Sequence, residues 1–197
     1  GSLTSRIFNW AWSNLAFGNP NKGPSSLLDN SPLKTLLQRT ISFKGIKRSL
    51  ENGHLHAYCV TACSYTTGES TTFYDGHEDI RDWHRTHRDG RRRTLNIDHL
   101  MASSAIPVIF PSVPIGNEHF GDGSMRQGSP ISPALHLGAD KILIIGLRIA
   151  SDDPVPPFSP PRPTLGQISG YVMDTLFLNS LRADLERLER INRTLEN

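Results

Sequence analysis

The 197-residue sequence lacks the features of a membrane-spanning, secreted or nucleic-acid-binding protein. A transmembrane helix needs about 20 mostly apolar residues in succession, and no such run occurs. The first ten residues, GSLTSRIFNW, contain no apolar core of the kind that a signal peptide carries. The formal net charge of +2 is too small to indicate a dedicated nucleic-acid binder. We therefore expect a globular, cytoplasmic protein whose contact with a membrane is at most peripheral.

Cysteine is equally scarce, with only Cys59 and Cys63 in the chain. On one strand the two would lie about 13 Å apart, which is beyond the reach of a disulfide. The spacing C-x3-C is not a strong zinc signature either. We therefore predict two buried thiols in a reducing compartment.

The order of helix and strand patterns predicts an α/β fold with a largely parallel central sheet. Residues 141–147, KILIIGL, are continuously apolar, as in a strand buried on both faces, and they follow a short helix that begins at Pro133 and ends at Gly138. Three further helices are expected: one capped by Ser31 with Pro32 at its first position, one ending at Gly53, and one from Asp98 to just before Pro107. Two strands are expected over 54–62 and 70–76, joined by the turn TTGES. Residues 79–94 are predicted to be a polar surface segment.

The chain divides into three parts by composition. Residues 1–150 carry the α/β pattern and begin with a helix-compatible stretch, over 3–17, that is apolar on several sides. Residues 151–163 are a proline-rich connector. Leucine and isoleucine then recur at helical spacing, so residues 164–197 are predicted to form a long amphipathic helix.

The most informative short motif is GDGSM, at 121–125, in which Asp122 lies between Gly121 and Gly123. A carboxylate held partly away from water is an effective proton acceptor, and flanking glycines allow close approach of another backbone and unusual dihedral angles. The alternative is that these residues form an ordinary DG turn after the strand EHF and have no catalytic role. The motif alone favours the turn.

The surroundings of this motif change that balance, because they resemble the patatin-like phospholipase family, bacterial type. The matching segments are ASSAIPVIFPSV at 102–113, GDG at 121–123, SPISPALHLGAD at 129–140 and the strand after it, with further similarity upstream in SLLDNSPLKTLL and HLHAYCVTACSYTTGESTTFY. The resemblance implies a three-layer α/β lipid acyl hydrolase with a Ser–Asp dyad and no metal or organic cofactor. It assigns the general base to Asp122. Ser124 stands where the family most often has Gly or Ala, and its hydroxyl could hydrogen-bond the carboxylate.

The nucleophile that the resemblance implies is absent from the sequence. The family places it in G-x-S-x-G, but the nearest strings, GPSSL at 23–27 and GESTT at 68–72, both lack the last glycine. The glycine-rich oxyanion segment is missing too. The interpretation is a C-terminal portion of the domain, inactive alone, with a sheet incomplete at its N-terminal side.

Two expectations about partners follow from that interpretation. The substrate is a phospholipid or another acyl-ester lipid. The strand at 54–62, or its neighbour, has an open apolar edge, which predicts a homo-oligomer or pairing with the missing N-terminal part. The rival hypothesis is a patatin-like interaction module that has no catalytic activity.

Three other clusters support weaker hypotheses. His54 with His56, and His84 with His87, have metal-ligand spacing, but no third ligand stands out, so we predict no metal. The aromatic residues at 8, 10, 12 and 17 suit packing better than a membrane interface. A run of arginines could bind anionic lipid headgroups or nucleic-acid phosphates. We favour the alternative of a solvated basic loop whose charge is balanced by nearby aspartates. The run comprises Arg81, Arg85, Arg88, Arg91, Arg92 and Arg93.

Overall fold

The structure, a computed structural model, describes residues 26, 28–126, 128–145, 186, 189–190 and 192–194. The chain forms two compact units, Gly1–Arg126 and Gln127–Asn197. The helix expected over 3–17 and the connector over 151–163 lie outside the described residues. So does most of the helix expected over 164–197, of which only 186, 189–190 and 192–194 are described, all as helical.

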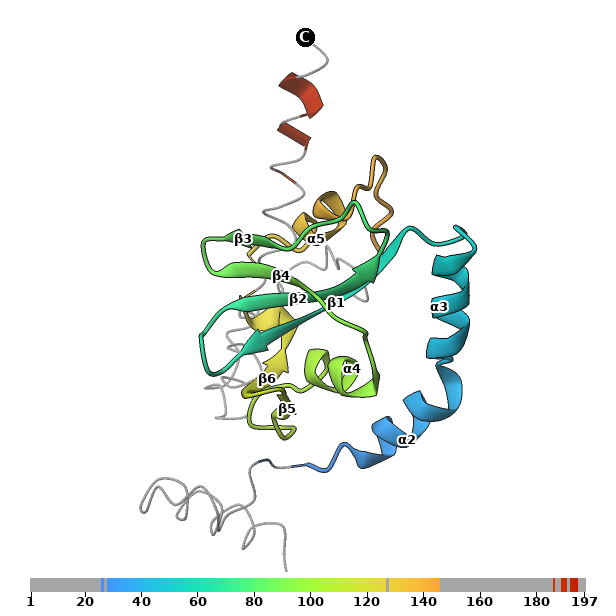
Figure 1. The fold of residues 1–197 in the computed structure, drawn as a ribbon. Coiled ribbons are helices and arrows are strands. Elements are labelled where there is room, and N and C mark those ends of the chain that lie inside the picture. The colour runs from blue at the N-terminus through green and yellow to red at the C-terminus, as the bar shows by residue number, and fades with distance from the viewer. Residues whose placement is uncertain are drawn as a thin grey trace, which may run out of the picture. The chain divides into compact units, whose positions relative to one another are not determined.

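The first unit is built on one six-stranded sheet with the strand order β3-β4-β2-β1-β6-β5 (Figure 1). Its strands are β1 Ala57–Ser64, β2 Ser70–Gly76, β3 Trp83–Arg85, β4 Arg88–Arg92, β5 Val113–Ile115 and β6 Glu118–Asp122. Only β2 and β4 pair in parallel, and the other neighbours are antiparallel. The prediction of a largely parallel sheet is therefore wrong. The physical reason is that three pairs of consecutive strands are joined by short turns, which permit only antiparallel pairing.

The helices of this unit begin and end close to the predicted positions. They are α2 Ser31–Thr40, α3 Phe43–Glu51 and α4 Ile97–Ser103. The N-cap of α2 is Asn30, and Ser31 is the first helical residue, so the predicted cap is displaced by one position. Gly53, with φ of 70°, lies just after α3, as a left-handed residue at a helix end should.

The core of the first unit lies between the sheet and α4. Its buried members are Ala62, Phe73, Leu95, Ala102 and Phe120. The rings of Phe73 and Phe120 meet edge to face with centroids 5.1 Å apart. Because α4 packs against β1, β5 and β6, this core fixes the end of β6, where the GDG motif lies.

The segment predicted as a polar surface excursion is in fact the hairpin of β3 and β4. The Trp83 ring stacks on Tyr74 with centroids 5.1 Å apart, and it covers Gly90 so closely that any side chain there would clash. Asp89 is buried as well. The hairpin was missed because the buried residues of β4 are Asp89 and Gly90, so the sequence shows no apolar alternation.

The second unit contains the predicted short helix, α5 Ser132–His136, followed by Gly138 with φ of 87°. The strand predicted over 141–147 is not found in its described part, residues 141–145. Leu143 and Ile145 are 87% and 84% exposed. A strand is stabilised by pairing with a neighbour, and no described strand pairs with this segment. Within the described residues, none of the helices is long and apolar enough to cross a bilayer.

Candidate functional site

Asp122 is the last residue of β6 and is followed directly by a 3₁₀ turn, Gly123–Arg126. It lies opposite Ala62 of β1 in the antiparallel register. Its backbone N–H donates to the carbonyl of Ala105, beyond the end of α4, at 3.0 Å. The position of the carboxylate is therefore set by both the sheet and the chain that leaves α4.

The Asp122 side chain is half-buried and only partly hydrogen-bonded. Its Oδ1 accepts from the backbone N–H of Ser124 at 2.9 Å and from the Ser124 hydroxyl at 2.6 Å. The hydrogen bond expected from the Ser124 hydroxyl is thus present. Its Oδ2 has no hydrogen-bond partner in the part of the chain that the structure describes. The carboxylate is therefore oriented through one oxygen only.

Gly121 and Gly123 are required by close packing. A Cβ atom on Gly121 would collide with the Tyr65 ring, and one on Gly123 would collide with the carbonyl of Thr61. Neither glycine is among the residues with positive φ. The expectation that another backbone approaches closely is confirmed at Gly123, whereas the close neighbour of Gly121 is a side chain. The expectation of unusual dihedral angles is wrong for both glycines.

The two cysteines near this end of the sheet are free thiols. Burial raises the pKa of Cys59 to about 11. Burial also raises the pKa of Cys63, opposed by the Arg126 charge and assisted by Asp122. Both thiols are therefore protonated at neutral pH and are poor nucleophiles. The prediction of a buried thiol is confirmed for Cys63, whereas Cys59 is only partly buried.

Strand β1 is only partly covered on the side that faces Asp122. Strand β2 pairs with β1 from Ala57 to Cys63, but β6 pairs only with Ala62–Ser64. Within the described residues this side of β1 therefore has no strand partner at 57–61, and the 3₁₀ turn that follows Asp122 contacts β1.

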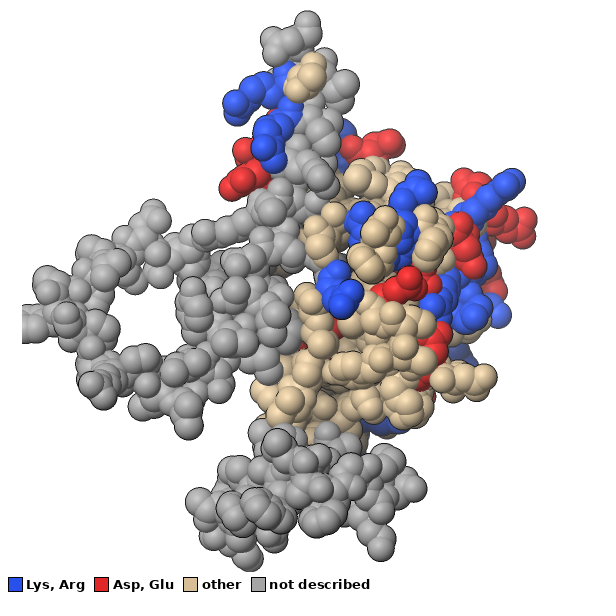
Figure 2. Space-filling view, turned by 90° about the vertical axis from the view of Figure 1, so that its left-hand side faces the viewer, with Lys and Arg blue, Asp and Glu red and all other residues tan. Residues whose placement is uncertain are grey.

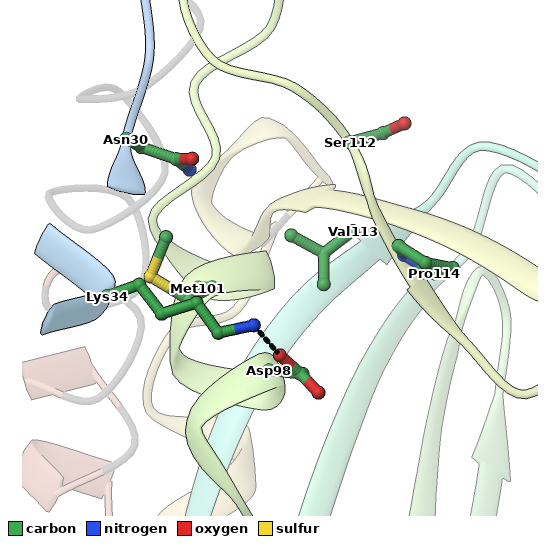
Figure 3. A pocket seen from close by; sticks show the side chains of 7 residues that line it. All are labelled: Asn30, Lys34, Asp98, Met101, Ser112, Val113 and Pro114. Carbon is green, nitrogen blue, oxygen red and sulfur yellow. Dashed lines mark hydrogen bonds and ion pairs between the residues drawn. The ribbon is translucent and has the colours of Figure 1, made fainter. Parts of the chain in front are cut away.

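A pocket of about 310 Å³ lies elsewhere on the first unit (Figure 3). It is lined by residues from α2, α4 and the chain around β5, namely Asn30, Lys34, Asp98, Met101, Ser112, Val113 and Pro114. In Figure 3 the Lys34 ammonium reaches across to the Asp98 carboxylate, and the two atoms are 2.9 Å apart. Asp122 is not among the lining residues, so this pocket does not involve the GDG carboxylate.

The arginine run is less available to an anionic ligand than the sequence suggests. Arg91 forms ion pairs with Asp89 and with Glu118, the latter at 2.6 Å. Arg92 donates to the backbone carbonyls of Gly76, His77 and Ile80, with its guanidinium 5.2 Å from the Tyr74 ring centre. Figure 2 shows basic and acidic side chains interleaved on the visible face. The favoured expectation of a charge-balanced segment agrees with this arrangement, although the segment is a hairpin.

The structure also gathers a group that the sequence spacing did not reveal. His56 lies with His77 and Asp79, so that one ligand atom from each falls within 4.8 Å of the others. The described residues place neither His54 nor the His84 and His87 pair in such a group. Two histidines of this set are far apart in sequence, and only the pairing of β1 with β2 could have indicated their proximity.

The fold and the site together define an α/β protein in which a carboxylate is presented at the end of a sheet strand. The family model described as patatin-like phospholipase matches residues 2–135, which is more than half of the chain and includes the whole sheet and Asp122. The chain belongs to the patatin-like phospholipase family, whose members are generally lipid acyl hydrolases. No curated protein and no solved structure gives a significant match.

Proposed function

We propose that this chain supplies the general base, Asp122, to a phospholipase A-type lipid acyl hydrolase that works with a Ser–Asp dyad. The observation that carries the proposal is the unengaged Oδ2 of Asp122, in a region that matches the family. The 197 residues contain no G-x-S-x-G. We therefore place the serine and the oxyanion donors in a segment outside them, and assign this chain to the C-terminal part of a bacterial-type domain.

The open side of β1 supports this arrangement. Gly123 packs directly on the carbonyl of Thr61, so Asp122 lies where β6 stops covering β1. A strand added along residues 57–61 would end or begin beside the carboxylate. A serine on the turn after such a strand would reach Asp122 without an intervening histidine.

The chemistry of the proposed dyad proceeds in two stages. In the first, Asp122 accepts the serine proton while the serine oxygen attacks the acyl carbonyl, and the alcohol portion of the lipid leaves with that proton. In the second, Asp122 accepts a proton from water as the water oxygen attacks the acyl-enzyme, and it returns that proton to the serine oxygen as the bond to the acyl group breaks and the fatty acid is released. The substrate is a phospholipid or another acyl-ester lipid, reached by a cytoplasmic protein through peripheral contact with the bilayer.

The test is Asp122→Asn in the protein joined to its own upstream coding segment. Asparagine keeps the shape but cannot accept the proton, so we expect phospholipid hydrolysis to fall by roughly a thousandfold or more. Asp140→Asn, at an exposed aspartate, is the matched control and keeps its activity. The 197-residue chain alone is expected to be inactive. Hydrolysis that continues near the wild-type rate in Asp122→Asn would refute the assignment of the base.

A second candidate is an interaction module without catalytic activity, and the absence of G-x-S-x-G from the sequence favours it. The two candidates differ in what precedes Gly1 in the coding sequence. A G-x-S-x-G upstream supports the hydrolase. A start codon at this point, without that motif, supports the module.

A further inference from the structure

We propose that His56, His77 and Asp79 form a binding site for a divalent transition metal of the zinc type. The three residues offer two imidazole nitrogens and one carboxylate oxygen. They share no residue with the site around Asp122. The proposed metal site can therefore be tested independently of the proposed hydrolase function.

The distances between the donor atoms suit a single ion. His77 Nδ1 lies 2.8 Å and His56 Nε2 lies 3.8 Å from Asp79 Oδ1. Zinc–ligand bonds of about 2.0–2.1 Å place two ligands of a tetrahedral ion about 3.3 Å apart. The observed separations fall on either side of that value. Rotation of the side chains, without movement of the backbone, can therefore bring all three donor atoms to coordination distance.

The two imidazoles are neighbours in space. Their ring centroids are 5.3 Å apart and their planes are inclined by 19°. Because an imidazole nitrogen binds a metal in the plane of its ring, one of the two rings must turn out of this stacked arrangement for both to reach the same ion.

The backbone holds the three donors in place. His56 immediately precedes β1 and His77 immediately follows β2, and the His77 N–H donates to the His56 carbonyl at 2.8 Å. Arg92 of β4 fixes the turn that follows by donating to the carbonyls of Gly76, His77 and Ile80. The Ile80 side chain is buried and anchors the same turn. A site on such a supported turn is more pre-organised than three side chains on a free loop.

The donor types select the class of ion. Two imidazoles and one carboxylate are the ligands of zinc and its neighbours, whereas calcium and magnesium prefer an all-oxygen set. The three side chains are between 52% and 64% exposed. Water can therefore fill the remaining coordination positions, and the ion can enter directly from solvent.

The test is metal titration of the untagged full chain. We expect one Zn²⁺ ion bound per chain, no binding of Mg²⁺ or Ca²⁺, and visible absorption bands with Co²⁺ that lack the charge-transfer band of thiolate ligands. His77→Asn and Asp79→Asn should each weaken Zn²⁺ binding by about tenfold or more, since even loss of an outer-shell partner costs 10–100-fold.

Matched controls are His54→Asn and Glu78→Gln, which alter an exposed histidine and an exposed acid beside the proposed ligands. These two variants should bind Zn²⁺ as the wild type does. Circular dichroism checks that every variant is folded, which the exposure of these side chains favours. The proposal would be overturned if His77→Asn and Asp79→Asn bound Zn²⁺ as tightly as the wild type does, or if the Co²⁺ spectrum contained a thiolate charge-transfer band.

Discussion

At the scale of single residues, the two glycines beside Asp122 have different roles. Gly121 is covered by the Tyr65 ring, a side chain that is 46% exposed and can move. Gly123 is covered by the backbone of β1 at Thr61, which cannot move without disturbing the sheet. The sequence indicated that small residues were needed here. It could not indicate which neighbour each one contacts, because those contacts depend on how β1 and β6 pair.

The contrast predicts unequal costs for adding one methyl group. Gly123→Ala should lower the free energy of unfolding by about 1–3 kcal/mol, the usual cost of overpacking. Gly121→Ala should cost less, because Tyr65 can turn away. Urea unfolding of both variants measures the difference, with Gly128→Ala, which meets nothing within 4 Å, as the control. Equal losses in the two variants would contradict this account.

At the scale of secondary-structure elements, a partly buried polar cluster joins three strands. Glu118 of β6 accepts from the Ser64 hydroxyl of β1 at 2.7 Å and pairs with Arg91 of β4. Arg91 also pairs with the buried Asp89. The sequence did not reveal this cluster, since charged residues in a run indicate a solvated loop. Their burial follows from the parallel pairing of β2 with β4, which is a long-range feature.

This cluster makes the stability of the sheet dependent on pH. Burial alone would raise the pKa of Glu118, but the Ser64 hydroxyl and the Arg91 charge outweigh it and hold that pKa below its usual value. The folded pKa is thus lower than the unfolded one. The stabilisation is complete above the unfolded value, about 4.3, and is lost as the pH falls through the folded value.

Glu118→Gln should therefore weaken the acid dependence of stability. Urea unfolding between pH 3 and pH 7, as roughly the window set by the carboxylate pKa, measures it for the variant and the wild type. Glu51→Gln, at an exposed surface glutamate, should leave the wild-type slope unchanged. A Glu118→Gln profile that runs parallel to the wild type would show that the carboxylate makes no contribution of this kind.

At the scale of the whole molecule, local patterns predicted elements better than their assembly. The helices at 31–40 and 43–51 and the hairpin over 57–76 have strong local signals, such as a proline in the first helical turn and the turn TTGES. The strand order has no local signal in the sequence, and the prediction of a largely parallel sheet was wrong. Asp122 was found from its glycines and the family resemblance, whereas the group at His56 depends on strand pairing.

Self-association is the prediction at this scale. Leu143 and Ile145 are both more than 80% exposed, and contiguous exposed apolar residues favour association. We expect the isolated chain to dimerise or form larger species at micromolar concentration, and the double variant Leu143→Lys with Ile145→Lys to shift it toward the monomer. Light scattering coupled to gel filtration measures the mass. Leu36→Lys, at an exposed leucine of α2, is the control, and an unchanged mass in the double variant would exclude this surface.

The hydrogen bond from the Asp122 amide to the Ala105 carbonyl connects the acid to the chain just beyond the end of α4. A shift of α4 along the sheet would move this carbonyl, and the end of β6 would move with it. Given the role proposed for Asp122, substitutions on α4 are expected to lower lipid hydrolysis in a protein that is still abundant and folded. In a screen for loss of function, this short helix would then score like part of the proposed dyad.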